Sequence, residues 1–179
     1  MSAIKNNVGN WLCDERDIMD HINKSFMELY STSQDRLDLN FPPSSTWHLS
    51  LMDSDKDNLD YEVTDDEIKA ALWSLKASKA PGPNGLHASF FQWFWLIVGD
   101  SVKAEVKKVF AGKKVPDYLN RTHIALIPKM QGPETKGNHR PSSLCNIVYK
   151  VITKIIVARL RPILGELISS FQTASVPGR

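Results

Sequence analysis

The sequence lacks the residue patterns on which common active sites are built. Its 179 residues include only two cysteines, Cys13 and Cys145, which lie far apart and outside any zinc-ligand spacing. The five histidines form no His-x-x-x-His pair, and neither a Gly-x-x-x-x-Gly-Lys phosphate loop nor a Gly-x-Ser-x-Gly turn occurs. The sequence therefore excludes a disulfide-rich scaffold, a common zinc site, a P-loop enzyme and an α/β-hydrolase.

Long apolar runs are also missing. The longest strongly apolar stretch runs from Phe90 to Val98, is interrupted by Gln92, and is too short to span a bilayer. The first residues, MSAIKNNVGNW, contain no apolar core of the secretory type. A composition of 42% hydrophobic and 23% charged residues is typical of a folded domain. We expect an intracellular protein with no membrane partner, and the sequence does not distinguish nucleus from cytoplasm.

The net charge of +2 conceals a strong asymmetry along the chain. Residues 1–100 hold 8 Lys/Arg against 16 Asp/Glu, a balance of −8, whereas residues 101–179 hold 14 against 4, a balance of +10. A segment this basic is typical of proteins that meet phosphates. The alternative is a solvated surface whose cations pair with the acidic half, and charge alone does not decide between the two.

Local patterns predict a mostly helical chain. A helix is expected over Asp14 to Ser31, followed by an extended linker from Ser31 to Tyr61 that contains Pro42-Pro43. Thr64 and Glu67 have capping-box spacing, with Val63 and Ile68 as a hydrophobic staple, and predict the next helix start. This helix should end near Lys79, because Pro81 disfavours the α conformation at Ala80.

The remaining elements are predicted from apolar periodicity and from proline and glycine positions. The aromatic residues after Ala88 are expected to form core rather than a base-stacking platform. Ile147, Val151, Ile155 and Ile156 are among the inward positions of the last helix. The predicted elements are a helix from Ala88, a helix over Ser101–Phe110, a strand over Thr122–Pro128, a loop from Met130 to Arg140 and a helix from Asn146 to about Leu164. The fold class is therefore α+β, mostly helical, with a short strand pair between Thr122–Pro128 and the Arg140 region.

Four short motifs follow one another between Trp73 and Arg179. They are KAPGPNG at 79–85, IALIPK at 124–129, RPSSLCN at 140–146 and QTASVPGR at 172–179. Their order is more specific than any one of them, and in this order they resemble the fingers region of plant LINE-type (non-LTR) retrotransposon reverse transcriptases. Asn84 replaces the aspartate that the family has in its first motif, and asparagine also serves turns.

The resemblance implies roles for particular residues. Lys129 and Arg140 match the cations that grip the phosphates of the incoming nucleotide, for which a compact ammonium and a bidentate guanidinium are suited. On the residues alone, each could equally be a surface charge or part of a local ion pair. The turn after Lys79 either contacts the template backbone through exposed N–H groups or is simply a tight helix connection. Residues implied in template contact are Lys79, Gly82, Asn84, Gly85 and Arg179.

The resemblance also implies what lies elsewhere in the family. Its metal-binding aspartates follow these motifs in the palm, so residues 61–179 are expected to form a partial reverse transcriptase domain that stops before the palm. Residues 1–60 resemble the connector between endonuclease and polymerase. Two-metal phosphoryl transfer needs carboxylates, so we assign no catalytic and no metal-binding residue. Mg²⁺ is expected for the full-length family enzyme only, and the chain alone is expected to be inactive.

Three hypotheses follow for the function. The first is a truncated retroelement RNA-directed DNA polymerase, with template-primer and nucleotide as partners. The second is a non-enzymatic RNA- or DNA-binding module that uses the basic residues 101–179. The third is a helical protein-interaction fragment. The apolar surfaces of Phe90–Val98 and Ile147–Leu164 would pack on a palm in the family, so exposed apolar area and self-association are expected here.

Overall fold

The computed structural model describes residues 3–31 and 52–167. The fourth motif with Arg179 and the Pro42-Pro43 pair of the predicted linker lie outside the described residues. Contacts divide the chain into two compact units. The first, called the hairpin unit below, contains residues 1–45 and 124–142, and the second, called the helical unit, contains residues 46–123 and 143–179. Each unit is described by itself.

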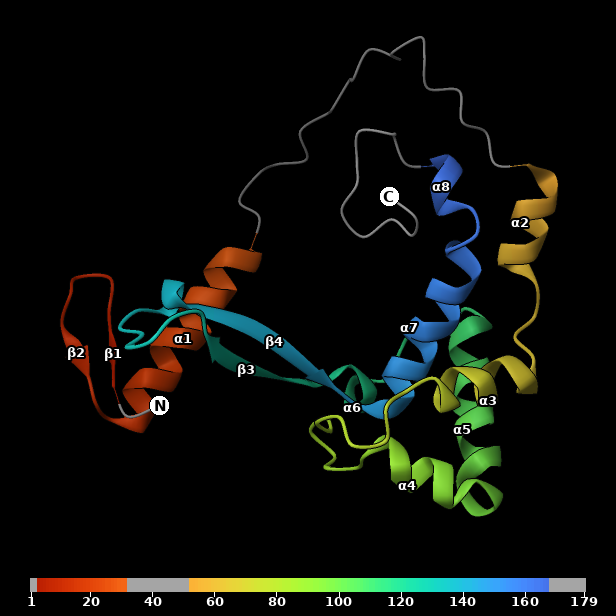
Figure 1. Cartoon of the computed structure of the whole chain (residues 1–179), viewed down its shortest axis with the longest axis horizontal. Helices are drawn as coiled ribbons and strands as arrows, with labels where there is room; N and C mark the ends of the chain where they lie inside the picture. The colour runs from red at the N-terminus through yellow and green to blue at the C-terminus, as the bar shows by residue number, and fades with distance from the viewer. Residues whose placement is uncertain (1–2, 32–51, 168–179) are drawn as a thin grey trace, which may run out of the picture. The chain divides into compact units, whose positions relative to one another are not determined.

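The helical unit holds most of the secondary structure and its elements follow the chain in order (Figure 1). Together with the strands below, they confirm an α+β chain that is mostly helical. The helices are α2 (Asp53–Asp60), α3 (Asp65–Trp73), α4 (Ala88–Trp93), α5 (Trp95–Phe110), α6 (Asp117–Asn120), α7 (Ile147–Leu160) and α8 (Leu164–Leu167).

The start of α3 confirms the predicted capping box. Glu67 N–H donates to the Thr64 hydroxyl over 3.2 Å, and Thr64 N–H donates to the Glu67 carboxylate over 3.0 Å. Val63 and Ile68, the predicted staple, are both buried. Two backbone donors that the first turn leaves unpaired are therefore satisfied locally, which is why this boundary could be placed from sequence.

The predicted end of α3 near Lys79 is wrong, because the helix stops at Trp73. The amide of Gln92, in α4, donates to both Leu72 O and Leu75 O over 3.1 Å. The Ser74 hydroxyl also donates to Ala71 O over 2.7 Å. These side chains satisfy carbonyls that a longer helix would pair with its own N–H groups, and the main one comes from 20 residues away in the chain.

The aromatic segment bends at Phe94, where α4 ends and α5 begins, and this bend is called the α4–α5 elbow below. The sequence predicts one helix from Ala88 and a separate helix that starts at Ser101. Phe94 closes α4 and opens α5, with φ −100° and ψ 23°. The predicted start of the second helix at Ser101 is wrong, because α5 already begins at Trp95. The Trp95 ring packs over Gly99, one helical turn away, where a Cβ would lie 3.0 Å from the ring.

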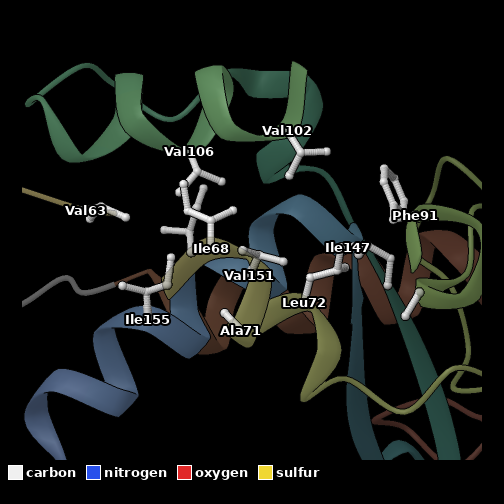
Figure 2. Close-up of a cluster of buried hydrophobic side chains, with 12 residues drawn as sticks. Val63, Ile68, Ala71, Leu72, Phe91, Val102, Val106, Ile147, Val151 and Ile155 are labelled. Carbon is white, nitrogen blue, oxygen red and sulfur yellow. The ribbon is translucent and has the colours of Figure 1, made fainter. Parts of the chain in front are cut away.

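The core of the helical unit lies between α3, α5 and α7. Figure 2 shows aliphatic side chains of these helices pointing toward one another, with Val106 of α5 above Ile68 of α3 and Val151 of α7 close by. The predicted inward face of α7 is confirmed at Ile147, Val151, Ile152 and Ile155. It is wrong at Ile156, which is 42% exposed. The buried face of α7 is therefore narrower than the apolar composition of this helix suggests.

Helix α2 lies inside the segment that was expected to be an extended linker, so that part of the prediction is wrong. Asp53 and Asp55 in its first turn complement the helix dipole, and Lys56 Nζ lies 2.8 Å from Asp53. The carbonyls of Leu59 and Tyr61, at the far end, accept hydrogen bonds from Arg159. A distant cation thus stabilises a helix that its own sequence, rich in Asp, Ser and Asn, hardly indicates.

The hairpin unit begins with two strands that sequence patterns did not indicate, β1 (Ile4–Lys5) and β2 (Trp11–Leu12). They pair antiparallel, with Ile4 opposite Leu12 and Lys5 opposite Trp11. Helix α1 (Glu15–Tyr30) follows as predicted. Its N-cap Asp14 accepts hydrogen bonds from the N–H groups of Arg16 and Asp17. Ile4 and Ile18 are the buried aliphatic residues of this part of the chain.

The predicted strand pair is confirmed as a hairpin of β3 (Thr122–Pro128) and β4 (His139–Cys145), which run antiparallel (Figure 1). A single 3₁₀ turn, η1 (Lys136–Asn138), lies in the connecting loop. The Thr135 N–H donates to the Asn138 side chain over 3.0 Å, so that the loop is ordered by its own polar groups.

Candidate nucleic-acid interface

Lys129 and Arg140 lie on the exposed face of the β3–β4 hairpin. The Lys129 N–H donates to Asn138 O over 2.8 Å, which places these two residues opposite each other. Arg140 is two residues beyond Asn138, so it lies diagonally opposite Lys129 on the same face, about 7 Å away by ordinary sheet spacing. The structure thus brings the two predicted phosphate-binding residues together.

Neither of these cations forms an ion pair with a carboxylate in the described residues. Lys129 Nζ donates to Gly137 O over 2.9 Å, which leaves two of its three N–H donors unused. The Arg140 side chain is exposed and keeps its whole guanidinium fork for a ligand. Two cations on neighbouring strand positions, both with free donors, are chemically able to bind an oligophosphate.

Lys5 neutralises the acidic residue of the hairpin loop, a role that sequence reasoning missed. Its Nζ lies 2.6 Å from the Glu134 carboxylate and 4.8 Å from the centre of the Trp11 ring. Its backbone N–H also donates to Glu134 O over 2.6 Å. The two residues are 129 positions apart, so no local pattern could have found the pair. Its effect is to compensate the negative charge of Glu134 in the loop between β3 and β4.

The turn at 81–85 belongs to the helical unit, and its backbone N–H groups differ from the template-contact alternative. It was predicted to expose backbone N–H groups, but Asn84 N–H donates to Asn146 and Gly85 N–H donates to Gly82 O. Leu86 N–H donates to the Asn84 side chain, so asparagine indeed serves this turn. Contact of the turn with a template backbone stays a prediction, and those N–H groups are not free to make it.

The cation that remains beside this turn is Lys79. Its side chain is exposed and forms no ion pair among the described residues, while its carbonyl accepts a hydrogen bond from His87 Nδ1 over 3.0 Å. Lys79, Gly82, Asn84 and Gly85 therefore lie together within the helical unit. Gly85 has φ +71°, a conformation that favours glycine.

Other cations of the basic half are used within the fold, as the alternative of internal charge pairing predicts. Asp65 lies 2.6 Å from Lys107 and 3.2 Å from Lys103, and hydrogen bonds from these two lysines lower its pKa. Arg159 donates from Nε and Nη2 to the Glu67 carboxylate over 3.0 and 2.9 Å. The Arg159 guanidinium, helped by Thr64, lowers the pKa of Glu67 although burial opposes the shift.

The α4–α5 elbow exposes large apolar side chains. Trp93 is 79% exposed and Leu96 is 99% exposed, and Phe94 and Ile97 are exposed beside them in the chain. Phe91 is buried, so the prediction that these aromatic residues form core holds for only part of the segment. The expected exposed apolar area is present within Phe90–Val98.

Metal-ligand clusters and membrane-spanning helices are both absent from the part of the chain that the structure describes. No group of three or more His, Cys, Asp or Glu side chains in ranges 3–31 and 52–167 has an arrangement that could hold a metal ion. No helix in this part of the chain combines the length and the apolar character that a membrane crossing requires.

The sequence is similar to part of a curated transposon protein. The chain is 35% identical over 124 residues to the transposon TX1 uncharacterized 149 kDa protein of Xenopus laevis. The match covers 69% of this chain and 10% of that protein, so the chain spans about a tenth of its relative's length. No protein-family model matches the chain.

Proposed function

We propose that this chain belongs to the RNA-directed DNA polymerase of a LINE-type retroelement and forms a phosphate-binding part of its fingers. Three independent observations support the proposal. The four motifs occur in the family's order, the sequence is similar to a transposon protein, and residues 101–179 carry a charge balance of +10. The partners are a nucleic-acid template-primer and a nucleotide.

The observation that carries the proposal is the pair of exposed cations on one face of the hairpin. Lys129 keeps free donors and Arg140 keeps its whole fork, while Lys5 neutralises the nearby Glu134. A structural ion pair would have used these cations inside the fold, as Glu67 uses Arg159. Phosphate oxygens are among the acceptors to which such unpaired cations donate strong hydrogen bonds.

The test is the salt dependence of binding to a fluorescent single-stranded RNA, measured by anisotropy. Each phosphate contact contributes about −0.7 to the slope of log K against log salt for a single strand. We expect Lys129→Ala and Arg140→Ala each to weaken binding about five-fold and to lower the slope by about that amount. Lys108→Ala is the matched control, since it removes the same charge from a lysine that pairs with Glu105.

The competing functions give different results in the same assay. Equal losses in all three variants would indicate diffuse attraction, as in a non-enzymatic RNA-binding module without a defined phosphate site. Binding that is absent or independent of salt would contradict both nucleic-acid functions and leave a protein-interaction role. Primer extension by the purified chain with Mg²⁺ would contradict the expectation that it is inactive alone.

Self-association through the exposed elbow residues is a second part of the proposal. Trp93, Phe94, Leu96 and Ile97 place four large apolar side chains in solvent within five positions. Sedimentation velocity over a range of concentrations should reveal oligomers that Leu96→Asp reduces. A monomer at every concentration would remove this partner from the proposal.

A further inference from the structure

Asn146 immediately precedes α7 but does not cap it. Asparagine at this position usually accepts a hydrogen bond from the second or third N–H of the helix, and here no such side-chain bond exists. The side chain is instead turned to two other segments, and the residue is only 3% exposed. Its Oδ1 accepts from Asn84 N–H over 3.2 Å, and its Nδ2 donates to Tyr118 O over 2.8 Å.

Two contacts besides this one hold the turn against the start of α7, and a third joins it to the start of α4. A Cβ on Gly82 would lie 2.5 Å from the carbonyl carbon of Cys145, so only glycine allows the two backbones to approach this closely. Lys150 Nζ donates to Ala80 O over 3.1 Å, and His87 Nδ1 donates to Lys79 O over 3.0 Å. The turn that carries Lys79 is thus fixed from both sides.

We infer that Asn146 is a positioning residue, which gives up its helix-capping bond to hold the turn at 81–85, and with it Lys79, in place for a nucleic-acid phosphate. The inference rests on the proposed function. A turn that is already ordered loses less conformational freedom when it binds, which strengthens binding without a new contact. Both halves of the Asn146 amide are needed, because one accepts and the other donates.

The substitution N146D removes the donating half of this amide. At neutral pH a carboxylate has no proton to donate to Tyr118 O, and repulsion between these oxygens turns the side chain away, so its hydrogen bond with Asn84 N–H is weakened as well. Burial raises the pKa of such a carboxyl, so protonation restores the donor as the pH falls toward 5. Aspartate also serves as a helix cap, so a loss cannot be attributed to a weaker start of α7.

The experiment compares N146D with the wild-type chain and with Asn58→Asp, which introduces the same charge at an exposed position of α2. At pH 7.5 we expect the Asn84 amide of N146D to exchange hydrogen about ten-fold faster and RNA affinity to fall about five-fold, each for the loss of about one buried hydrogen bond. At pH 5 both ratios to wild type should return toward one. Asn58→Asp should show neither change.

Each outcome decides either the positioning role of Asn146 or the proposed nucleic-acid function. Wild-type exchange and affinity in N146D at both pH values would overturn the positioning role. Faster exchange with unchanged affinity would also overturn it, since the turn would then be ordered for stability alone. If the wild-type chain binds no RNA, the proposed function fails while the exchange data still report on the turn. If N146D is unfolded at pH 7.5, Asn146 supports the fold as a whole, and the positioning role is overturned.

Discussion

Arg159 of the helical unit and the exposed pair Lys129 and Arg140 of the hairpin unit are used in opposite ways. In the helical unit, Arg159 is 9% exposed at its side chain and donates to the Glu67 carboxylate and to two backbone carbonyls. In the hairpin unit, Lys129 and Arg140 remain in solvent and pair with no carboxylate among the described residues. Positive charge in sequence therefore does not by itself indicate a ligand site, and what distinguishes the two cases is whether the fold supplies an acidic partner.

The two units also differ in what holds them together. A continuous aliphatic core joins α3, α5 and α7 in the helical unit. The hairpin unit buries Ile4 and Ile18 and adds the strand pair of Ile4 and Lys5 with Trp11 and Leu12. Because burial of apolar area is the largest favourable term in folding, substitutions in the helical unit should have the larger effects on stability.

The largest effect is expected from Arg159→Ala. The Arg159 side chain is 9% exposed and that of Glu67 34% exposed. The substitution leaves Glu67 without its cation and two carbonyls without a donor, and these losses together should cost about 3–5 kcal/mol. Urea denaturation measures the loss. Lys56→Ala is the control, since its pair with Asp53 is exposed and should contribute less than about 1 kcal/mol. A loss in Arg159→Ala as small as in the control would show that the pair is not desolvated.

Arg159→Ala should also change how the unfolding free energy depends on pH in the acid range. The pKa of Glu67 is lowered in the folded chain, so its contribution is present above its unfolded pKa and is lost as the pH falls through the lower folded value. Without Arg159 the largest cause of that shift is lost and only Thr64 still lowers the pKa of Glu67, so the unfolding free energy should depend less on pH below about 4.5. Denaturation curves between pH 3 and 6 would show this, and parallel pH profiles for both proteins would contradict it.

A smaller effect is expected from Gly82→Ala. The new Cβ would lie 2.7 Å from Asn146 Cα, and backbone cannot yield as a side-chain end can, so we expect a loss of about 3 kcal/mol. Gly85→Ala is the matched control in the same turn. Nothing lies within 4 Å of its Cβ, and only its φ of +71° opposes the change, at about 1 kcal/mol. Equal losses in thermal melting would mean that conformation, not close approach, requires both glycines.

Sequence alone could predict those features whose causes are local. The capping box of Thr64 and Glu67 and the strand over Thr122–Pro128 depend on residues within a few positions, and both were found. The closeness of Lys129 to Arg140 could be expected because the loop between the two residues is short. These features needed no knowledge of the rest of the chain.

Features that depend on distant partners could not be predicted. Helix α3 ends early because Gln92 takes its last carbonyls, and α2 forms where Arg159 binds its end. Asn146 has the sequence position of a helix cap, yet its side chain contacts Asn84 instead. Lys5 has no local feature that indicates Glu134. In each case the deciding hydrogen bond joins residues that the sequence places far apart.

The smallest effect is expected from Lys5→Ala, which tests how the hairpin unit is held. The ion pair with Glu134 is partly exposed and should contribute about 0.5 kcal/mol, with a similar amount from the contact with the Trp11 ring. The backbone bond from Lys5 N–H to Glu134 O persists in the variant, so urea denaturation should show a total loss of about 1 kcal/mol or less.

The substitution nevertheless leaves the Glu134 carboxylate uncompensated near Lys129, and this should weaken RNA binding more than it weakens folding. Adding Glu134→Gln removes the carboxylate and should restore affinity, although the ion pair is still absent. A double-mutant cycle in 50 mM salt measures this coupling, and the effect should shrink at 500 mM salt because screening removes it. If affinity stays low in the double variant, Lys5 acts by holding the loop in shape and not by neutralising its charge.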